Sequence, residues 1–440
     1  MTPLGFLIVC VSGFLVLTLP RRKALAPLLL GMVYTPFAQS LEIGVSLSAI
    51  RVLILIGLAR IIVRGESVKG PLNTVDKAMI LWGIWALCSS VFHTGNALVF
   101  RAGLVLDCLG GYYVFRSLVK DMDDIRFTFK LVCIPFVLVG LGMLAEKLTG
   151  KNAFAFIGKV NLDAGIRHGH FRGQGPFGHA ILAGTIGAIT FPMALYLWRL
   201  DRKRAVIGMA AGAAIVVGSG SSGPIMTLLT IVAAMAFWRM RWYLRAACWG
   251  AVVLIIALDI VMKDPVYFLL ARIDLTGGST GWHRAALIQS AIHHLSGWWL
   301  GGTDYTRDWM PTGVYWSANH TDITNYFIQM GVYGGLPLMC LFIGVLWAAF
   351  ARLVKAFKQH KNAPFQDRFL IWTMGAILFG HVTTFFSVSY FDQTVPFFFL
   401  LLASIGSLRA AKVKKAQAST PAEMTAWSAP KHEQNIYHHS

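Results

Sequence analysis

Long apolar runs dominate this sequence and leave few folds open to it. Most of them lie near the length that a helix needs to cross the apolar core of a bilayer, about 20 residues. Only 13% of the residues are charged, against about 25% in soluble domains. An all-α polytopic membrane protein with 12 or 13 transmembrane helices is therefore predicted, as a single domain over residues 1–408. The runs cover residues 4–19, 25–40, 43–63, 78–96, 98–115, 128–148, 175–198, 205–219, 224–239, 246–262, 336–351, 369–388 and 394–408.

Basic residues cluster in alternate loops between these runs, around residues 21–23, 64–77, 116–130, 199–204, 239–245, 352–368 and 409–415. Cytoplasmic loops of membrane proteins carry an excess of Lys and Arg, so these loops are predicted to be cytoplasmic. This pattern explains the net charge of +19 without nucleic-acid binding. Thirteen spans with an outer amino terminus satisfy the alternation, as do twelve if the first two runs form one re-entrant or interfacial unit. The polar residues 409–440 are predicted to form a disordered cytoplasmic tail.

The remaining loops, 149–174, 219–223, 263–335 and 389–393, are then extracytoplasmic. Residues 263–335 form the one long segment that is too polar to cross a bilayer, and ionisable side chains gather in it. We expect this loop to carry the working surface of the protein, with short helices inside it. The stretch Gly281 to Leu295 has the periodicity of an amphipathic helix with Ser279 or Thr280 as its N-cap. Arg284 falls in its first turn, where exposed amides favour an anion.

A second candidate segment runs from Arg167 to His179 and leads directly into an apolar run. Glycines on both sides of Arg172 let the backbone approach a ligand closely. An arginine at the membrane surface suits a diphosphate because its planar fork binds oxygens in pairs. The alternative is that Arg167 and Arg172 extend to lipid headgroups.

A third candidate is His320, which begins a run that continues through Asp322 and Asn325 to Gly331. At helical spacing His320 and Thr324 share a face, and Asp322 lies off it. A neutral imidazole, with an ordinary pKa of about 6.5, can accept a proton from a hydroxyl. A solitary histidine is more often structural than catalytic, so both interpretations stay open here.

In their order and spacing these residues resemble the bacterial O-antigen ligase and polysaccharide polymerase superfamily of polytopic glycosyltransferases. His320 followed by Gly331 and Gly334 is similar to that family's histidine, hydrophobic helix and closing Gly-x-x-Gly. The resemblance covers roughly residues 165–390. It also includes two further groups: Trp282, Arg284, Ala291, Ile292, His294 and Gly301-Gly302, and Arg172 with Gly175, Phe177, His179 and Ala183.

Two positions differ from the family pattern. Thr321 stands where the family usually has an asparagine, which bears on the acceptor that is used. The short outer loop Ser221-Ser222-Gly223 lacks the family's arginine, a possible phosphate ligand, and Arg272 or Arg307 could replace it.

The resemblance implies transfer of a glycan from a polyprenyl (undecaprenyl) diphosphate carrier to an acceptor hydroxyl. Arg172 and Arg284 would bind the diphosphate, and His320 would be the catalytic base of a single inverting displacement. Because the arginines neutralise the leaving group, no metal and no cofactor are expected. Other possible substrate-binding residues are Arg272, Arg307, His294, Asp322 and Asn325.

Several functions remain open at this point. A ligase moves a finished glycan to a different lipid or glycan acceptor, whereas a polymerase extends O-antigen or exopolysaccharide repeat units with the same donor chemistry. A protein O-glycosyltransferase and a polytopic transporter are further alternatives. The enzyme interpretation places the chain in the bacterial inner membrane, with lipids as neighbours, its active site facing the periplasm and its oligomeric state open.

Overall fold

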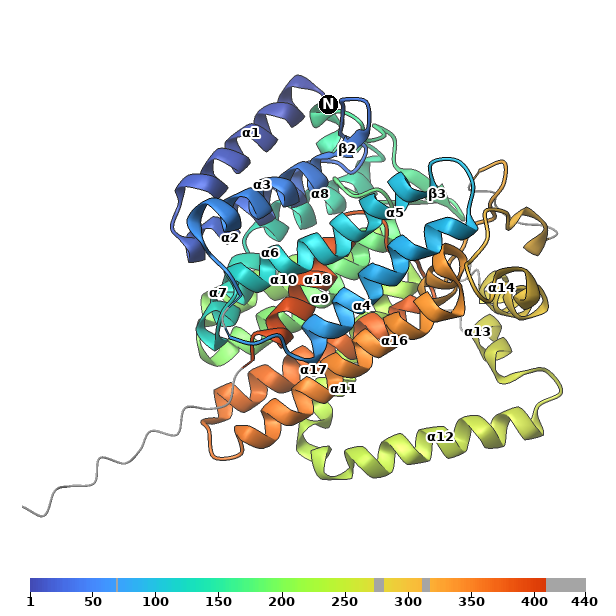
Figure 1. Cartoon of the computed structure of the whole chain (residues 1–440). Helices are drawn as coiled ribbons and strands as arrows, with labels where there is room; N and C mark the ends of the chain where they lie inside the picture. The colour runs from blue at the N-terminus through green and yellow to red at the C-terminus, as the bar shows by residue number, and fades with distance from the viewer. Residues whose placement is uncertain (69, 273–280, 311–316, 409–440) are drawn as a thin grey trace, which may run out of the picture.

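The computed structural model describes residues 1–68, 70–272, 281–310 and 317–408, and within them the chain is mostly helical (Figure 1). The expected N-caps Ser279 and Thr280 and the tail 409–440 lie outside the described residues. The first half contains α1 (Pro3–Thr18), α2 (Arg21–Tyr34), β1 (Ser40–Glu42), β2 (Ser46–Ser48), α3 (Ala49–Arg64), α4 (Thr74–Cys88), η1 (Ser89–Phe92), α5 (Ala97–Val105), η2 (Leu106–Gly110), α6 (Gly111–Leu118), α7 (Met122–Val132), α8 (Pro135–Thr149), η3 (Ala153–Ile157), β3 (Gly165–Arg167), β4 (His170–Arg172), α9 (Ala180–Tyr196) and η4 (Leu197–Arg199).

The second half continues with α10 (Arg202–Ser219), α11 (Ser222–Ala236), η5 (Phe237–Tyr243), α12 (Leu244–Val261), η6 (Val266–Phe268), α13 (Leu269–Arg272), α14 (Gly281–His293), α15 (Leu295–Trp298), η7 (Arg307–Trp309), α16 (Tyr326–Gln359), α17 (Phe365–Phe385) and α18 (Thr394–Gly406). The strands form two antiparallel hairpins, β1–β2 and β3–β4.

Each of the thirteen apolar runs contains a helix, which confirms the all-α prediction. Six helical stretches of the described chain are long and apolar enough to cross a membrane: Thr74–Phe92, Ala97–Leu118, Met122–Thr149, Ala180–Arg199, Ser222–Val261 and Tyr326–Gln359. The apolar helices Pro3–Thr18 and Thr394–Gly406 are shorter than a full span.

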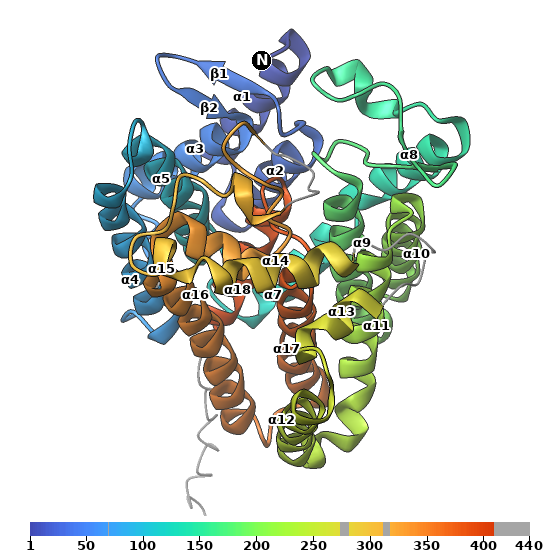
Figure 2. The ribbon, with the colours of Figure 1, turned by 90° about the vertical axis from the view of Figure 1, so that its right-hand side faces the viewer.

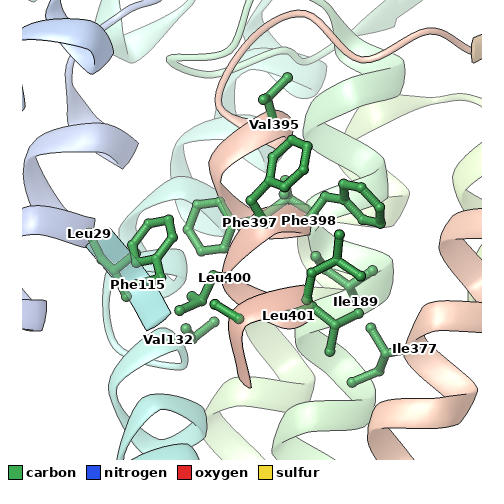
Figure 3. Close-up of a cluster of buried hydrophobic side chains, with 14 of the residues drawn as sticks. Leu29, Phe115, Val132, Ile189, Ile377, Val395, Phe397, Phe398, Leu400 and Leu401 are labelled. Carbon is green, nitrogen blue, oxygen red and sulfur yellow. The ribbon is translucent and has the colours of Figure 1, made fainter. Parts of the chain in front are cut away.

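The core of the bundle lies around α18, whose thirteen residues are all buried. Helices α6, α9, α16 and α17 contact it. Figure 3 shows Phe397, Phe398 and Leu401 of α18 among apolar side chains from helices distant in sequence, including Leu29 and Ile377. Burial of large aromatic side chains fixes the positions of the surrounding helices, because each ring removes 150–250 Å² from solvent.

The large polar loop is shorter than predicted. Helix α16 begins at Tyr326, so residues 326–333, expected in the loop, are already helical. Asn325 caps this helix by accepting the amides of Phe327 and Ile328. A kink at Gly334 and Gly335 then separates this first part from the apolar run that begins at residue 336.

The predicted glycine turn of the loop, Gly301-Gly302, packs against the kink of α16. A Cβ at Gly302 (φ 93°) would lie 2.2 Å from the carbonyl oxygen of Val332, and one at Gly335 (φ 75°) would lie 2.2 Å from that of Leu300. The two backbones therefore approach too closely for any other residue at these positions. This contact, together with the hydrogen bond from the Leu336 amide to the Trp299 carbonyl (2.7 Å), places the loop against the end of the bundle.

Helices α13, α14 and α15 lie at one end of the bundle, and α14 crosses it (Figures 1 and 2). Helix α12 stands apart from the other helices in Figure 1 and has no buried residue. Inside the bundle, Arg51 forms an ion pair with Asp107 (2.8 Å), whereas Arg101 donates to the carbonyl of Tyr333 and to Ser89.

Candidate functional site

The glycine-rich turn before α9 is held in place by polar side chains from other parts of the chain. Oε2 of Glu146 accepts the amides of Gln174 (3.1 Å) and Gly175 (2.8 Å). Gly173 lies so close to α8 that a Cβ would be 2.7 Å from the carbonyl oxygen of Met143. Asp392, just before α18, accepts the amide of Gly178 at 3.0 Å. Thus the turn that leads from Arg172 to α9 is fixed by two carboxylates from distant parts of the chain, Glu146 of α8 and Asp392 just before α18.

Replacement of Glu146 should therefore destabilise the protein. Glu146→Ala leaves the buried amide of Gly175 and the partly buried amide of Gln174 without an acceptor, and a buried unpaired amide costs about 1–3 kcal/mol, whereas Glu146→Gln keeps one acceptor oxygen and should cost less. Thermal unfolding in detergent should show a clear decrease in Tm for the alanine variant. Lys151→Ala, which removes only an exposed ion pair with Asp163, is the control and should change Tm little. Equal Tm values for Glu146→Ala and the control would contradict this role.

Arg172, the last residue of β4, points to the turn between α10 and α11. Its Nη2 donates to Oγ of Ser221 (2.6 Å), and its Nε donates to the carbonyl of Ser219 (3.4 Å). Gly220, between these two serines, has φ 55°, which allows the tight turn without strain. Arg172 therefore donates a hydrogen bond to the short outer loop, Ser221-Ser222-Gly223, which has no arginine of its own.

Arg284 reaches the same region from the large polar loop. It lies in the first turn of α14, and its Nε donates to the carbonyl of Ser387, just past the end of α17 (3.2 Å). A Cβ at Gly223, in the first turn of α11, would lie 3.8 Å from Ile181 and 3.9 Å from Oγ of Ser387. The beginnings of α9 and α11 and the end of α17 thus meet, and they bring Arg172 and Arg284 to one place.

Arg167 completes what we call the arginine cluster, Arg167, Arg172 and Arg284. Burial lowers the pKa of both Arg172 and Arg284, and the positive charge of Arg167 lowers each further. All three stay charged, because an arginine is not deprotonated in proteins. The cluster therefore concentrates positive charge in a partly desolvated place, which favours an anion.

The positive charges of the arginine cluster also act on His179. Although solvent still reaches its side chain, burial and the charges of Arg172 and Arg167 lower its pKa to about 4. The neutral ring caps α9, with Nδ1 accepting the amide of Ile181 at 3.1 Å. The helix N-termini of α9 and α11 add their own partial positive charges here. Helix ends of this kind, next to arginines, suit phosphate oxygens.

His320 lies in extended loop rather than in a helix, so the expected shared helical face with Thr324 is wrong. The helix starts only at Tyr326, because Asn325 is its N-cap. Nδ1 of His320 lies 3.4 Å from Oγ1 of Thr306. Burial lowers the pKa of the imidazole, and the negative charge of Asp304 partly opposes this shift. His320 is consequently neutral at neutral pH.

The His320 segment and the arginine cluster share their supports. Nε2 of His283, the residue before Arg284, lies 3.2 Å from the carbonyl oxygen of Asp322. Oγ of Ser389, two residues after Ser387, donates to the carbonyl of Ile323 at 2.6 Å. Burial raises the pKa of the Asp322 carboxyl, and His283 partly opposes the shift. The segment that carries His320 is therefore attached to the same two elements that hold Arg284.

The other predicted binding residues lie outside the arginine cluster. The ring of His294 is exposed and stacks on Trp309, with Nδ1 at 2.8 Å from the carbonyl oxygen of Ser290. Arg307 lies near the His320 segment and donates to the carbonyl of Ser317 at 3.4 Å. Arg272 ends α13 with an exposed side chain. Asn325 is buried, and its carbonyl oxygen caps α16.

Sequence reasoning missed the contributions of Glu146, Asp304 and Ser221. Glu146 is the only carboxylate in the apolar run 128–148, and this isolation was a usable signal. Asp304 gave no comparable signal, because its partners His93 and Thr94 are more than 200 residues away in the sequence.

Among the described residues, no group of three or more His, Cys, Asp or Glu side chains is placed to hold a metal ion. No protein-family model matches this sequence, and no curated protein matches it either.

Proposed function

We propose that this protein is a membrane glycosyltransferase of the O-antigen ligase type, which transfers a glycan from a polyprenyl diphosphate carrier to an acceptor hydroxyl. The observation that carries the proposal is the arginine cluster at the N-termini of α9 and α11, with the His320 segment attached to the same supports. The site would face the periplasm at the outer surface of a bacterial inner membrane, in surface polysaccharide assembly.

On the donor side, Arg172 and Arg284 would bind the diphosphate. As the bond between the anomeric carbon and the diphosphate oxygen breaks, negative charge develops on the leaving oxygen. Fixed guanidinium groups stabilise that charge more in the transition state than in the ground state, which lowers the barrier. The partly buried position of both arginines strengthens the effect, since water screens them less than at an open surface.

On the acceptor side, His320 would be the general base. With Nδ1 protonated and facing Oγ1 of Thr306, Nε2 is left to accept the proton of the attacking hydroxyl. The acceptor oxygen then forms its bond to the anomeric carbon from the face opposite to the departing diphosphate, so the configuration inverts. Burial keeps the imidazole neutral and ready to accept a proton at neutral pH.

The bundle suits a lipid-linked donor. The apolar helices around the site would let a polyprenyl tail stay in the bilayer while the diphosphate reaches the arginine cluster at one end of the bundle. Loop helices α13 to α15 lie over this end, where the sugars would extend into water (Figure 2).

The test is a transfer assay with purified protein in detergent, a polyprenyl-diphosphate oligosaccharide and a lipid-linked acceptor. We expect the glycan to move to the acceptor with inversion at the anomeric carbon. One discrete product indicates a ligase, whereas a ladder of products indicates a polymerase. Absence of product from a range of donors with folded protein, combined with donor movement across proteoliposomes, would instead support a transporter.

A further inference from the structure

A groove opens on the side of the bundle where the helix over Met122–Thr149 is interrupted. Helix α7 ends at Val132 and α8 begins at Pro135, which has no amide to continue the hydrogen-bond ladder. The groove beside this break has a volume of about 840 Å³. It is lined mainly by apolar side chains from α2, α8, α10 and the break itself, among them Leu30, Ile134, Val137, Leu138 and Ile207.

The break is built into the fold. The hydroxyl of Tyr34 donates to the carbonyl of Pro135 at 2.7 Å, so a polar group at the interruption has a partner inside the protein. Ile134 and Leu138 beside it are 55% and 60% exposed. Large exposed apolar side chains next to a hydrogen-bonded break favour a hydrocarbon chain over water in this groove.

One end of the groove is basic. Asp201, Lys203 and Arg204, in the first turn of α10 and just before it, line it there. Arg204 is paired with Asp201 at 3.1 Å. Lys203 makes no ion pair within the described parts of the chain. The groove thus combines an apolar wall with one uncompensated positive charge at its end.

This end lies far from the arginine cluster. Lys203 is at the start of α10, whereas Ser219, which contacts Arg172, is at its end. Sixteen residues of α-helix separate them by about 24 Å. The basic loop at residues 199–204 is also the side predicted to be cytoplasmic, so a molecule held here would come from the opposite leaflet to the glycan donor.

We propose that this groove binds an anionic phospholipid of the cytoplasmic leaflet. One acyl chain lies along Leu30, Ile134, Leu138 and Ile207, and the phosphodiester headgroup lies at Lys203. Basic pockets between helices on the cytoplasmic side are suited to such headgroups. The proposal requires the chain to lie in a membrane but does not depend on the transferase activity.

The experiment measures lipid binding by native mass spectrometry of the detergent-purified full chain, titrated with phosphatidylglycerol or phosphatidylcholine of the same acyl chains. Wild type should retain phosphatidylglycerol more strongly. Lys203→Ala should weaken its binding about fivefold, and Lys203→Glu should weaken it further, because one Lys near an anionic lipid surface contributes about 1 kcal/mol. Phosphatidylcholine binding should change little.

Two controls separate the groove from general charge effects. Lys355→Ala removes an exposed lysine of α16, which lies outside the groove, and should bind phosphatidylglycerol as wild type does. Ile207→Trp should reduce binding of both lipids by filling the groove. Equal phosphatidylglycerol binding by wild type and Lys203→Glu would overturn the proposal. Full displacement by water-soluble glycerol phosphate, or a preference for polyprenyl phosphate over phosphatidylglycerol, would overturn it too.

Discussion

Arg172→Ala and Arg284→Ala are each expected to reduce glycan transfer by about 10²- to 10³-fold, the loss seen when one fixed donor to a developing negative charge is removed. Both guanidinium groups are partly buried, and their hydrogen-bond partners Ser221 and Ser387 lie at the start of α11 and beside it. The decrease should appear mainly in kcat, because the leaving oxygen gains its charge in the transition state. Lysine at either position should restore only part of the rate, since it lacks the planar fork.

The matched control for these variants is Arg64→Ala. Arg64 is an exposed arginine at the end of α3, hydrogen-bonded to the carbonyl of Thr18, and it lies outside the arginine cluster. The Arg64→Ala variant should transfer glycan at the wild-type rate. Tm in detergent distinguishes lost chemistry from lost folding. Wild-type kcat in correctly folded Arg172→Ala and Arg284→Ala would show that the cluster does not act on the leaving group.

The apolar helices of this protein could be predicted because each of the thirteen apolar runs contains a helix, and the run is a local property of the sequence. The ends of the helices were harder to predict from the sequence. Asn325 caps α16, and the helix then passes through Gly334 and Gly335 before the apolar run begins. Residues 326–333 before the kink are largely apolar, but two consecutive glycines separate them from the long apolar run, so the sequence places them in the loop. In the structure they are helical, and the carbonyl of Val332 lies against Gly302 of the large loop.

The candidate site was predictable in residue type but not in arrangement. An arginine between glycines and another in the first turn of an amphipathic helix pointed to an anion from local sequence alone. Their convergence depends on Ser387, 103 residues after Arg284, and on Ser221, 49 residues after Arg172. Contacts at such separations follow from the packing of whole helices around α18, which no local pattern encodes.

The same limit explains why the surroundings of His320 were misjudged. Helical spacing paired it with Thr324, but Asn325 begins the helix after both residues. The partner that matters electrostatically is Asp304, which is itself held by His93 at 2.5 Å. Thus a residue in the loop between α4 and α5 helps to set the charge next to His320.

His320→Ala is expected to reduce transfer by about 10²- to 10⁴-fold, the usual contribution of a positioned general base. In wild type, kcat/KM should be full where the imidazole is neutral and should fall as pH decreases through the pKa of His320. Burial lowers that pKa, so this acidic limb should lie below about pH 6.5, the ordinary value for histidine. The alanine variant should lose the limb along with the rate.

Asp304→Asn tests the cause of the pH dependence separately from the base itself. The negative charge of Asp304 raises the pKa of His320 against the effect of burial, so its removal should move the acidic limb to still lower pH while His320 remains in place. His293→Ala, which removes an exposed ring at the end of α14, should leave both the rate and the limb close to wild type. A limb that stays at the same pH in Asp304→Asn and persists in the residual activity of His320→Ala must belong to another group. In that case a group other than His320 accepts the proton of the attacking hydroxyl. The His320 segment, attached to His283 and Ser389, then serves to place the substrate beside the arginines.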